Sequence, residues 1–524
     1  MDLFFNGVID SLNTKTTAMA VDGIKIVAIG SDVDILNLES PSSRKFNLNK
    51  KTVWPGLIDS HFHFDMYSQS LAQVKCETNT IEECLTLVWE KAKSTPPSQW
   101  ITGQGWNQNT WGSFGNVSQL DSVSGQHPVF LADKSIHAAW VNSAALKIAQ
   151  IDKDTPDPVG GSIQKDPEGN PTGILFENAV NLVEKYIPLI TNLQRLDYML
   201  NGQKSLHRLG LIGIHDFDRS DCFSALQEMH HAGTLTLRVT KSIPIQELDN
   251  AISIGLRTGF GDPHLHMGSV KLFADGALGP QTAAMLMPYE GTYDSFGTLL
   301  LKADEIFEIG LKATTHGWSL AIHAIGDKAN NEVLNGLAMI RQFEIANGLP
   351  QRLHRIEHLQ LLHPDDVKKV IDTGVIASMQ PIHILSDMFT ADKHWGKRSR
   401  MAYAFGSLLK SGTHLIFGSD APVESPNPFI GISAAVTRRR ENGDPGLSGW
   451  YPEERISIGD AKKAYSEIPA FVSGQGNRFG QLSAGLAADF IILPHNPLTV
   501  DPMELSHLLP EQVFVDGNCV FEIG

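Results

Sequence analysis

The amino-acid sequence predicts an α/β protein: a (β/α)8 TIM-like barrel, a small β-sandwich domain built from both termini, and a long insertion after the first barrel strand. Eight short apolar runs with strand character alternate with helical stretches, and both ends of the chain carry hairpin patterns. In addition, 147 residues separate His63, after the first run, from Gly210, where the second run begins. One βα step needs about 30 residues or a little more, so roughly a hundred residues form an insertion.

The apolar runs are the main support for the barrel. They span residues 53–58, 210–216, 235–240, 266–273, 318–323, 354–358, 375–380 and 414–420. Eight parallel strands with intervening helices close into a barrel, and active sites on this fold lie at the carboxyl ends of the strands. A Rossmann-type sheet is the main rival fold. It is disfavoured because no G-x-G-x-x-G motif follows any of these runs.

The two ends of the chain share a hairpin pattern. Residues 18–30 break at Asp22-Gly23, and residues 513–521 contain Asp516-Gly517, and both dipeptides favour tight turns. Neither end is long enough for a sufficient hydrophobic core by itself. We therefore expect the two ends to pair into one domain.

These patterns give three expected parts. Residues 1–55 and 475–524 form the β-sandwich domain, residues 56–474 form the barrel, and an inserted subdomain occupies about 75–200. We expect the insertion to fold over the mouth of the barrel. The alternative is a surface decoration remote from the active site.

Composition narrows the class of partner. The 524 residues carry a net charge of −16, which argues against nucleic acid or an anionic membrane surface. No run approaches the ~20 apolar residues of a membrane span. The N-terminus lacks the features of a signal peptide, and the four cysteines show no metal-binding spacing, so a cytoplasmic location is expected. We expect a small-molecule substrate and, by default, a homodimer.

The pair His61 and His63 is the most informative local feature. Side chains on a strand alternate between its faces, so a His-x-His sequence at the end of the first apolar run places two imidazoles on one side. Neutral imidazoles that converge in this way suit Zn, Fe, Ni or Mn. His264 and His266 also alternate, but they precede an apolar run instead of ending one.

Four further candidate ligands stand at or near the ends of later strands. Lys271 lies in the fourth run, His323 ends the fifth, His358 ends the sixth and Asp420 ends the eighth. A protonated amine cannot bind a metal, so Lys271 has two interpretations. It forms a salt bridge, for example with Asp275, or CO₂ carbamylates it and the new carboxylate bridges two cations.

These positions and their surroundings resemble the amidohydrolase superfamily of metal-dependent hydrolases, and within it the branch that contains N-substituted formamide deformylases. The superfamily-level matches are Pro55-Gly-Leu-Ile-Asp-Ser-His-Phe-His63, Val270-Lys-Leu-Phe-Ala-Asp-Gly276, Ile322-His-Ala-Ile-Gly-Asp327, Arg355-Ile-Glu-His358 and Gly418-Ser-Asp-Ala-Pro422. The branch-level matches are Gly105-Trp106, His137-Ala138, Trp140-Val-Asn-Ser143, Gly480-Gln-Leu482 and Ala488-Asp489-Phe490. Together they cover nearly the whole chain.

The resemblance implies two divalent metal ions, with zinc as the first expectation. In it, His61, His63 and Asp420 bind the more buried ion, His323 and His358 bind the second, and carbamylated Lys271 bridges them. The chain departs from the branch at Asn107, where Gly-Trp-Asp is common, and at Ile136, where Gly-His-Ala is common. Both departures lie in the insertion, so they bear on the substrate and leave the metal chemistry intact.

The predicted reaction is hydrolysis of a non-peptide C–N bond in an amide, an N-substituted formamide or a cyclic amide by a metal-bridging hydroxide. Asp420 is expected to accept the proton of the water and pass it to the leaving amine. Trp106 and His137 are expected to line the substrate pocket, although a buried tryptophan more often serves packing. Asp275, Asp327 and Gln380 stand at or just after strand ends and are candidates for hydrogen bonds that orient the histidines.

Three alternatives stay open. A mononuclear-metal deaminase of the same superfamily is disfavoured by Lys271, because one ion needs no bridge. Hydrolysis of an ester or phosphoester uses the same hydroxide. A non-catalytic barrel scaffold is disfavoured because all six candidate ligand positions carry competent side chains.

Overall fold

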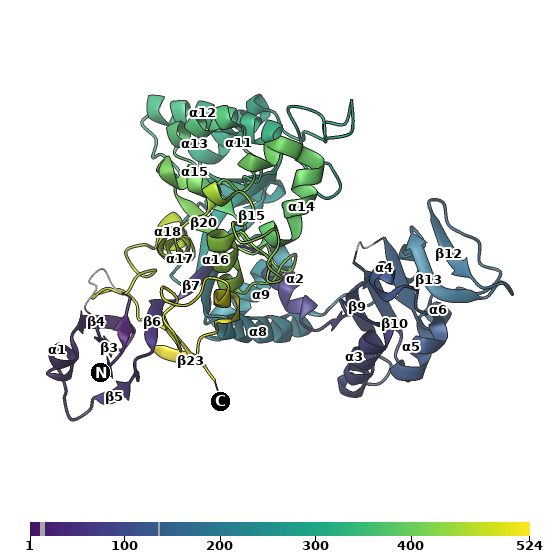
Figure 1. Ribbon diagram of the computed structural model, residues 1–524, viewed down its shortest axis with the longest axis horizontal. Coiled ribbons are helices and arrows are strands. Elements are labelled where there is room, and N and C mark those ends of the chain that lie inside the picture. The colour runs from purple at the N-terminus through teal and green to yellow at the C-terminus, as the bar shows by residue number, and fades with distance from the viewer. Residues whose placement is uncertain (11–15, 135–136, 524) are drawn as a thin grey trace. The chain divides into compact units, whose positions relative to one another are not determined.

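The computed structural model describes residues 1–10, 16–134 and 137–523, so the departure at Ile136 lies outside the described residues. The chain forms two compact units. One consists of Met1–Tyr67 with Met199–Gly524, and the other is Ser68–Tyr198 (Figure 1). The second unit occupies the region where the sequence predicts an insertion.

An eight-stranded parallel sheet forms the centre of the first unit and confirms the predicted α/β barrel. In spatial order its strands are β7 (Leu57–Phe62), β14 (Leu211–Asp216), β15 (Arg238–Pro244), β16 (Leu265–Phe273), β17 (Leu320–Ala324), β18 (Arg355–His358), β19 (Ile376–Met379) and β20 (Leu415–Phe417). The barrel is nearly closed, because Phe62 in the first strand forms a parallel bridge with Ala421, which lies just after the last strand.

Helices connect these strands and cover the outside of the barrel (Figure 1). They are α2 (Phe64–Ser70), α8 (Asn192–Arg208), α9 (Ser220–His231), α10 (Leu248–Ser253), α11 (Ala303–Thr315), α12 (Asp327–Ala346), α13 (Val367–Thr373), α14 (His383–Trp395), α15 (Phe405–Lys410), α16 (Pro428–Thr437), α17 (Ile458–Ala464) and α18 (Glu467–Val472). The Tyr67 hydroxyl lies 2.9 Å from Ser205 Oγ, so a hydrogen bond ties α2 to α8 within this unit.

Three barrel strands differ from the prediction by three residues or more at one end, and one of them is the expected strand 414–420, which ends at Phe417. The expected strand 53–58 is two strands that meet at Gly56, where a Cβ atom would lie 2.5 Å from the Ile212 side chain. The expected strand 235–240 begins three residues later, at Arg238. The Gln203 side chain donates to the Thr234 carbonyl and accepts from the Thr236 N–H. These backbone groups are therefore not available for pairing with a neighbouring strand.

The chain termini form two further sheets. One contains β1 (Asp2–Phe5), β3 (Ala18–Asp22), β4 (Lys25–Gly30) and β5 (Arg44–Asn47), and the other contains β2 (Val8–Ile9), β6 (Thr52–Pro55), β21 (Phe490–Leu493), β22 (Gln512–Val515) and β23 (Asn518–Glu522). Phe4 packs edge-on against Phe490, which stacks on Phe514 with ring centroids 4.4 Å apart. Both ends of the chain therefore contribute to one core, as predicted.

The Ser68–Tyr198 unit has its own six-stranded sheet and its own core. The strands are β8 (Val74–Lys75), β9 (Ile101–Trp106), β10 (Val129–Asp133), β11 (Ala138–Val141), β12 (Gly161–Lys165) and β13 (Pro171–Glu177). The helices are α3 (Ile81–Ser94), α4 (Gln108–Trp111), α5 (Val117–Ser124), α6 (Ser143–Ile148) and α7 (Asn181–Glu184). Trp106, Trp140 and Ile174 belong to its buried cluster.

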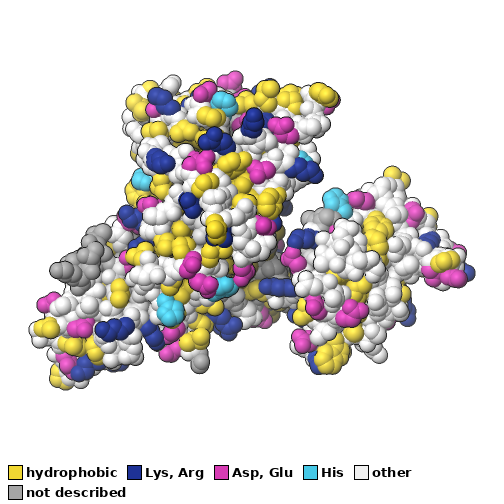
Figure 2. Space-filling model, viewed as in Figure 1, with side chains coloured by type: hydrophobic (Ala, Val, Ile, Leu, Met, Phe, Trp, Pro, Cys, Tyr) yellow, Lys and Arg dark blue, Asp and Glu magenta, His cyan; other side chains and the backbone are white. Residues whose placement is uncertain are grey.

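The surface mixes side-chain types. On the face drawn in Figure 2, acidic and basic side chains are interspersed with apolar ones. Among the described residues, no helix combines the length and the apolar character that are needed to cross a bilayer.

Candidate metal centre

The first barrel strand and the loop after the last one bring two imidazoles to one carboxylate. His61 lies in β7 and His63 directly follows its end, while Asp420 comes three residues after β20. The Nε2 atoms of His61 and His63 lie 3.5 and 3.3 Å from Asp420 Oδ1. Ligand atoms around a tetrahedral ion with bonds of about 2.0–2.1 Å lie about 3.3–3.4 Å apart. The three atoms therefore have the spacing of a ligand set.

The fifth and sixth barrel strands add two more imidazoles. The rings of His323 and His358 have centroids 4.6 Å apart, and the ring of His358 lies 5.0 Å from that of His61. Ligand atoms of His61, His358 and Asp420 all lie within 4.8 Å of one another. The structure thus brings all four predicted histidines to the same end of the barrel as Asp420.

In each of these histidines, one ring nitrogen forms a hydrogen bond with an acceptor outside the candidate ligand set. The partners are Glu357 Oε2 at 2.6 Å from His61 Nδ1, Asp218 Oδ1 at 3.1 Å from His63 Nδ1, the Gly276 carbonyl at 2.9 Å from His323 Nε2, and Gln380 Oε1 at 2.8 Å from His358 Nδ1. Because all four partners accept, the bonded nitrogen carries the proton. The other ring nitrogen of each histidine is then the one available to an ion, which is the arrangement found in metal-bound histidines.

Lys271 lies among these ligand candidates, in β16. Its Nζ atom is 3.5 Å from His61 Nε2 and lies over the rings of Phe217 and Phe273, at 4.6 and 5.1 Å from their centroids. Burial lowers the pKa of the Lys271 amine to about 8. Among the described residues, no ion pair joins Lys271 to Asp275, whose carboxylate accepts backbone N–H groups of Ala284, Ile325 and Gly326. The salt-bridge interpretation with Asp275 is therefore wrong.

A buried carboxylate network holds His63. Asp218 Oδ2 accepts the backbone N–H groups of Asp65 and Met66 at 2.6 and 3.2 Å, while its Oδ1 accepts from His63. The neighbouring Asp216 pairs with Lys241, with Nζ 2.8 Å from Oδ2. Burial opposes the charge of Lys241, but Asp216 raises its pKa. The ammonium group of Lys241 therefore balances the negative charge of Asp216.

A second network of buried polar side chains holds His61. Glu357 in β18 is fully buried and receives a two-point interaction from Arg355, with Nη2 3.0 Å from Oε2. Ser378 Oγ also donates to Oε2 at 2.7 Å. Burial opposes the charge of Glu357, but Arg355 and His61 hold the pKa of this carboxyl well below its usual value. Glu357 thus stays ionised and fixes the orientation of the His61 ring.

The backbone around the ligands is strained and closely packed. His358 and Asp420 have φ values of 72° and 60°, in the left-handed region that non-glycine residues rarely adopt. A Cβ atom on Gly418 would lie 2.4 Å from the His61 backbone nitrogen. The Asp59 carboxylate accepts N–H groups of His61 and Ser419 and so ties the first strand to the last. Strain of this kind is concentrated at functional sites.

Electrostatics differ between the histidines. Burial, aided by the charge of Lys271, lowers the pKa values of His61 and His323 to about 4. Burial also acts against protonation of His63, but its hydrogen bonds to Asp218 and Asp420 outweigh it and raise the pKa to about 9. The same two carboxylates that favour a proton on His63 favour a bound cation beside it.

The remaining predicted residues have different surroundings. Trp106 is fully buried in the core of the Ser68–Tyr198 unit, and its indole N–H donates to the Leu131 carbonyl at 2.7 Å. The His137 side chain is 69% exposed, with Nδ1 2.9 Å from Glu177. Of the three residues expected to orient the histidines, Gln380 bonds to His358, and Asp275 Oδ1 lies 3.7 Å from His323 Nε2. Asp327 instead accepts the backbone N–H of Leu286.

The sequence interpretation missed the residues that orient His61 and His63. Glu357 precedes His358 in Arg355-Ile-Glu-His358, and Asp218 ends the run His215-Asp-Phe-Asp218 after the second strand. An acidic residue near a strand end is a sequence signal that could identify both. The histidine that each one contacts lies on a different strand, and the sequence does not show which strands face each other.

Comparisons with known proteins agree with this geometry. Protein LONG AFTER FAR-RED 3 of Arabidopsis thaliana is 32% identical over 513 residues, covering 94% of this chain and 87% of the relative. N-substituted formamide deformylase of Arthrobacter pascens is 25% identical over 540 residues, covering 98% and 96%. A solved structure described as an uncharacterized metal-dependent hydrolase from Pyrococcus horikoshii OT3 has a TM-score of 0.76 at 28% identity and covers 96% of this chain and 99% of its own. Because the family model described as "Amidohydrolase family" also matches residues 45–521, the chain belongs to the amidohydrolase family.

Proposed function

We propose that the protein is a metal-dependent hydrolase that cleaves a non-peptide C–N bond in an amide, an N-substituted formamide or a cyclic amide. The arrangement of ring nitrogens carries this proposal. Four histidines each have one ring nitrogen bonded to an outer acceptor, which leaves the other nitrogen of each ring for an ion, beside Asp420 and Lys271. A structural cluster of histidines needs no such outer acceptor on every ring.

The donor set fits two divalent ions. His61, His63 and Asp420 would hold one ion and His323 and His358 the other, with Lys271 between them. Imidazole and carboxylate ligands suit Zn, Mn, Fe, Co and Ni, and zinc is our first proposal. Bound ions would supply Lewis acidity, which polarises a carbonyl group and lowers the pKa of water.

Lys271 supports the two-ion arrangement if its amine carries CO₂. The ammonium group first gives up one proton; the neutral amine then attacks the carbon of CO₂, an N–C bond forms, one C=O π bond becomes the carboxylate, and a second proton leaves the nitrogen, so that the product is an anionic carbamate. The Nζ atom lies against two aromatic faces and within 3.5 Å of His61 Nε2. A carbamate there would be stabilised by cations on either side. It would also remove the positive charge that otherwise repels metal ions from this position.

Asp420 is positioned to move the proton. Its Oδ1 faces the imidazoles of His61 and His63, so Oδ2 is the oxygen that can accept a proton from water and return it to the leaving amine. Its backbone N–H donates to the His61 carbonyl at 2.8 Å, which fixes the carboxylate against β7. The choice of a C–N bond rests on family membership and on the similarity to N-substituted formamide deformylase.

The test combines metal analysis with a substrate panel. Purified protein is analysed by mass spectrometry for metals beside Lys271→Ala and, as control, Lys463→Ala, an exposed lysine. We expect about two equivalents in the native protein and in Lys463→Ala, a clear loss in Lys271→Ala, and hydrolysis of formamides or amides that a chelator abolishes. About one equivalent, unchanged in Lys271→Ala, would refute the bridge and favour the deaminase. No metal after reconstitution would refute the hydrolase and favour the scaffold.

A further inference from the structure

A cavity lies at the end of the barrel opposite to the candidate metal centre. Its walls come from the end of α10, the end of α11 and the segment before β18, which lead into β16, β17 and β18. Its volume is about 350 Å³, within the range of about 300–1,000 Å³ of small-molecule sites. Lys271, His323 and His358 lie at the other ends of these strands, so this cavity is separate from the metal centre.

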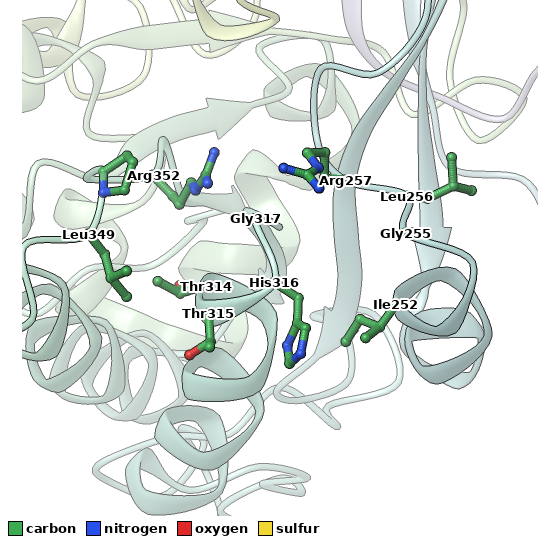
Figure 3. A pocket seen from close by; sticks show the side chains of 11 residues that line it. Ile252, Gly255, Leu256, Arg257, Thr314, Thr315, His316, Gly317, Leu349 and Arg352 are labelled. Atoms are coloured by element: carbon green, nitrogen blue, oxygen red, sulfur yellow. The ribbon is translucent and has the colours of Figure 1, made fainter.

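Two guanidinium groups face each other across this cavity. Figure 3 shows the side chains of Arg257 and Arg352 pointing toward one another on either side of Gly317. Gly317 has a φ of +86°, and a Cβ atom built on it would lie 3.3 Å from Arg257 Cβ and 3.4 Å from Arg352 Nη2. The absence of a side chain at Gly317 therefore allows both arginines to pack over the same point.

The two cations lack a protein counter-charge. None of the residues lining the cavity is acidic, and within the described ranges neither guanidinium takes part in an ion pair. Arg352 Nε is buried from solvent and has no hydrogen-bond acceptor. The adjacent Glu344 carboxylate is already occupied by Arg341, by His354 Nε2 at 3.3 Å and by the Arg352 backbone N–H. Among the described residues, no carboxylate therefore pairs with either guanidinium.

We propose that this cavity binds a small organic molecule through a phosphate group held between Arg257 and Arg352. In a protein with a net charge of −16, two unpaired cations that converge on one cavity are best explained by an anionic ligand. A guanidinium fork pairs with phosphate oxygens in a bidentate manner. A tetrahedral dianion presents oxygens to both sides, and a planar carboxylate engages only one fork fully.

The rest of the cavity suits the organic part of such a ligand. Ile252, Leu256 and Leu349 supply apolar walls. His316 lies on the lower side in Figure 3, and its Nδ1 bonds to the Lys312 carbonyl at 2.8 Å, which leaves Nε2 for a ligand. The cavity is larger than one inorganic phosphate, so an organophosphate fills it better than the ion alone.

The experiment measures binding of inorganic phosphate and of phenyl phosphate to the full-length protein by calorimetry, at constant ionic strength set with chloride. The protein is first made metal-free with a chelator, because phosphate also binds metal ions. We expect saturable binding of one equivalent, tighter for phenyl phosphate, and at least tenfold weaker in Arg257→Ala and in Arg352→Ala. Arg208→Ala is the matched control, because it removes an exposed arginine at the end of α8, which also leads into a barrel strand.

The outcomes separate clearly. Binding that is equal in all variants, or equally weakened in Arg208→Ala, would place the anion elsewhere and overturn the proposal. Absence of saturable binding to the native protein would overturn it as well. Arg257 is exposed, so Arg257→Ala is expected to fold even if Arg352→Ala does not, and its binding alone decides the question.

Discussion

The contact between His63 and Asp218 offers the sharpest test of the metal centre. In Asp218→Asn the side chain keeps its size but loses its charge. The Asp218 carboxylate receives three N–H donors: His63 Nδ1 at 3.1 Å and the backbone groups of Asp65 and Met66 at 2.6 and 3.2 Å. An amide has one acceptor oxygen, so its NH₂ group must face one of these donors. Whichever donor the NH₂ group faces, at least one of the hydrogen bonds that hold this side chain against His63 and α2 is lost.

The magnitude follows from the role of such outer partners. Replacing a residue that orients a metal-bound histidine lowers metal affinity by about 10–100-fold, which corresponds to about 1.4–2.7 kcal/mol. The donor–donor conflict in Asp218→Asn places the effect at the upper end of this range. The assay is a competition titration with a chromophoric chelator, which reports the affinity of the weaker and the tighter site separately.

A matched control exists elsewhere in the chain. Asp262 also accepts two backbone N–H groups, from His264 at 2.8 Å and Leu265 at 3.1 Å, and pairs with a histidine, His230, at 2.7 Å. It is outside the candidate ligand set, so Asp262→Asn should leave metal affinity unchanged. Native-like metal affinity in Asp218→Asn, or an equal loss in Asp262→Asn, would refute the reasoning.

Three further predictions concern stability and geometry. Burial holds the pKa of His207 at about 4 against a usual 6.5, so the protein loses up to about 3 kcal/mol of folding stability as the pH falls from 6.5 toward 4, and none of this loss occurs above pH 6.5. Chemical denaturation at several pH values should show that the free energy of unfolding falls less steeply with pH in His207→Gln. Equal slopes in the two proteins would contradict this. Trp106→Ala should destabilise its unit by about 3–5 kcal/mol in thermal unfolding, and Trp106→Phe should leave KM unchanged, whereas an altered KM in a stable Trp106→Phe would support the substrate contact. Gly418→Ala should weaken metal binding at least tenfold, because the new Cβ would lie 2.4 Å from the His61 backbone nitrogen; Gly279→Ala, where nothing lies within 4 Å, is the control, and equal affinities would contradict the argument.

The sequence predicts the barrel and the candidate ligands for one physical reason. Parallel strands are buried on both faces, so they stand out as apolar runs, and the polar residue that ends each run marks the rim. The sequence alone therefore indicates that His323, His358 and Asp420 lie at the carboxyl end of the barrel. The prediction gives the position of each residue along its own strand. It does not give the distance of that residue from residues on other strands.

What the sequence did not reveal depends on neighbours across strands. Glu357 reads as part of an ordinary strand, and its bond to His61 exists because β18 and β7 face each other across the barrel. The division of residues 53–58 at Gly56 depends on Ile212, which lies far along the chain. The late start of β15 depends on Gln203 in a helix. Such contacts between distant segments leave no periodic pattern in the sequence.

The hydrogen bond between Tyr67 and Ser205 has an evolutionary consequence. It joins the helices that precede and follow the Ser68–Tyr198 unit in the chain, so the chain leaves and re-enters the barrel unit at two points that the barrel unit's own residues hold together. The intervening unit has an independent sheet and core. It can therefore be exchanged as a cassette between relatives, with the ligand-bearing strands left untouched. Sequence changes in this unit and in the barrel can then accumulate on separate stretches of the gene.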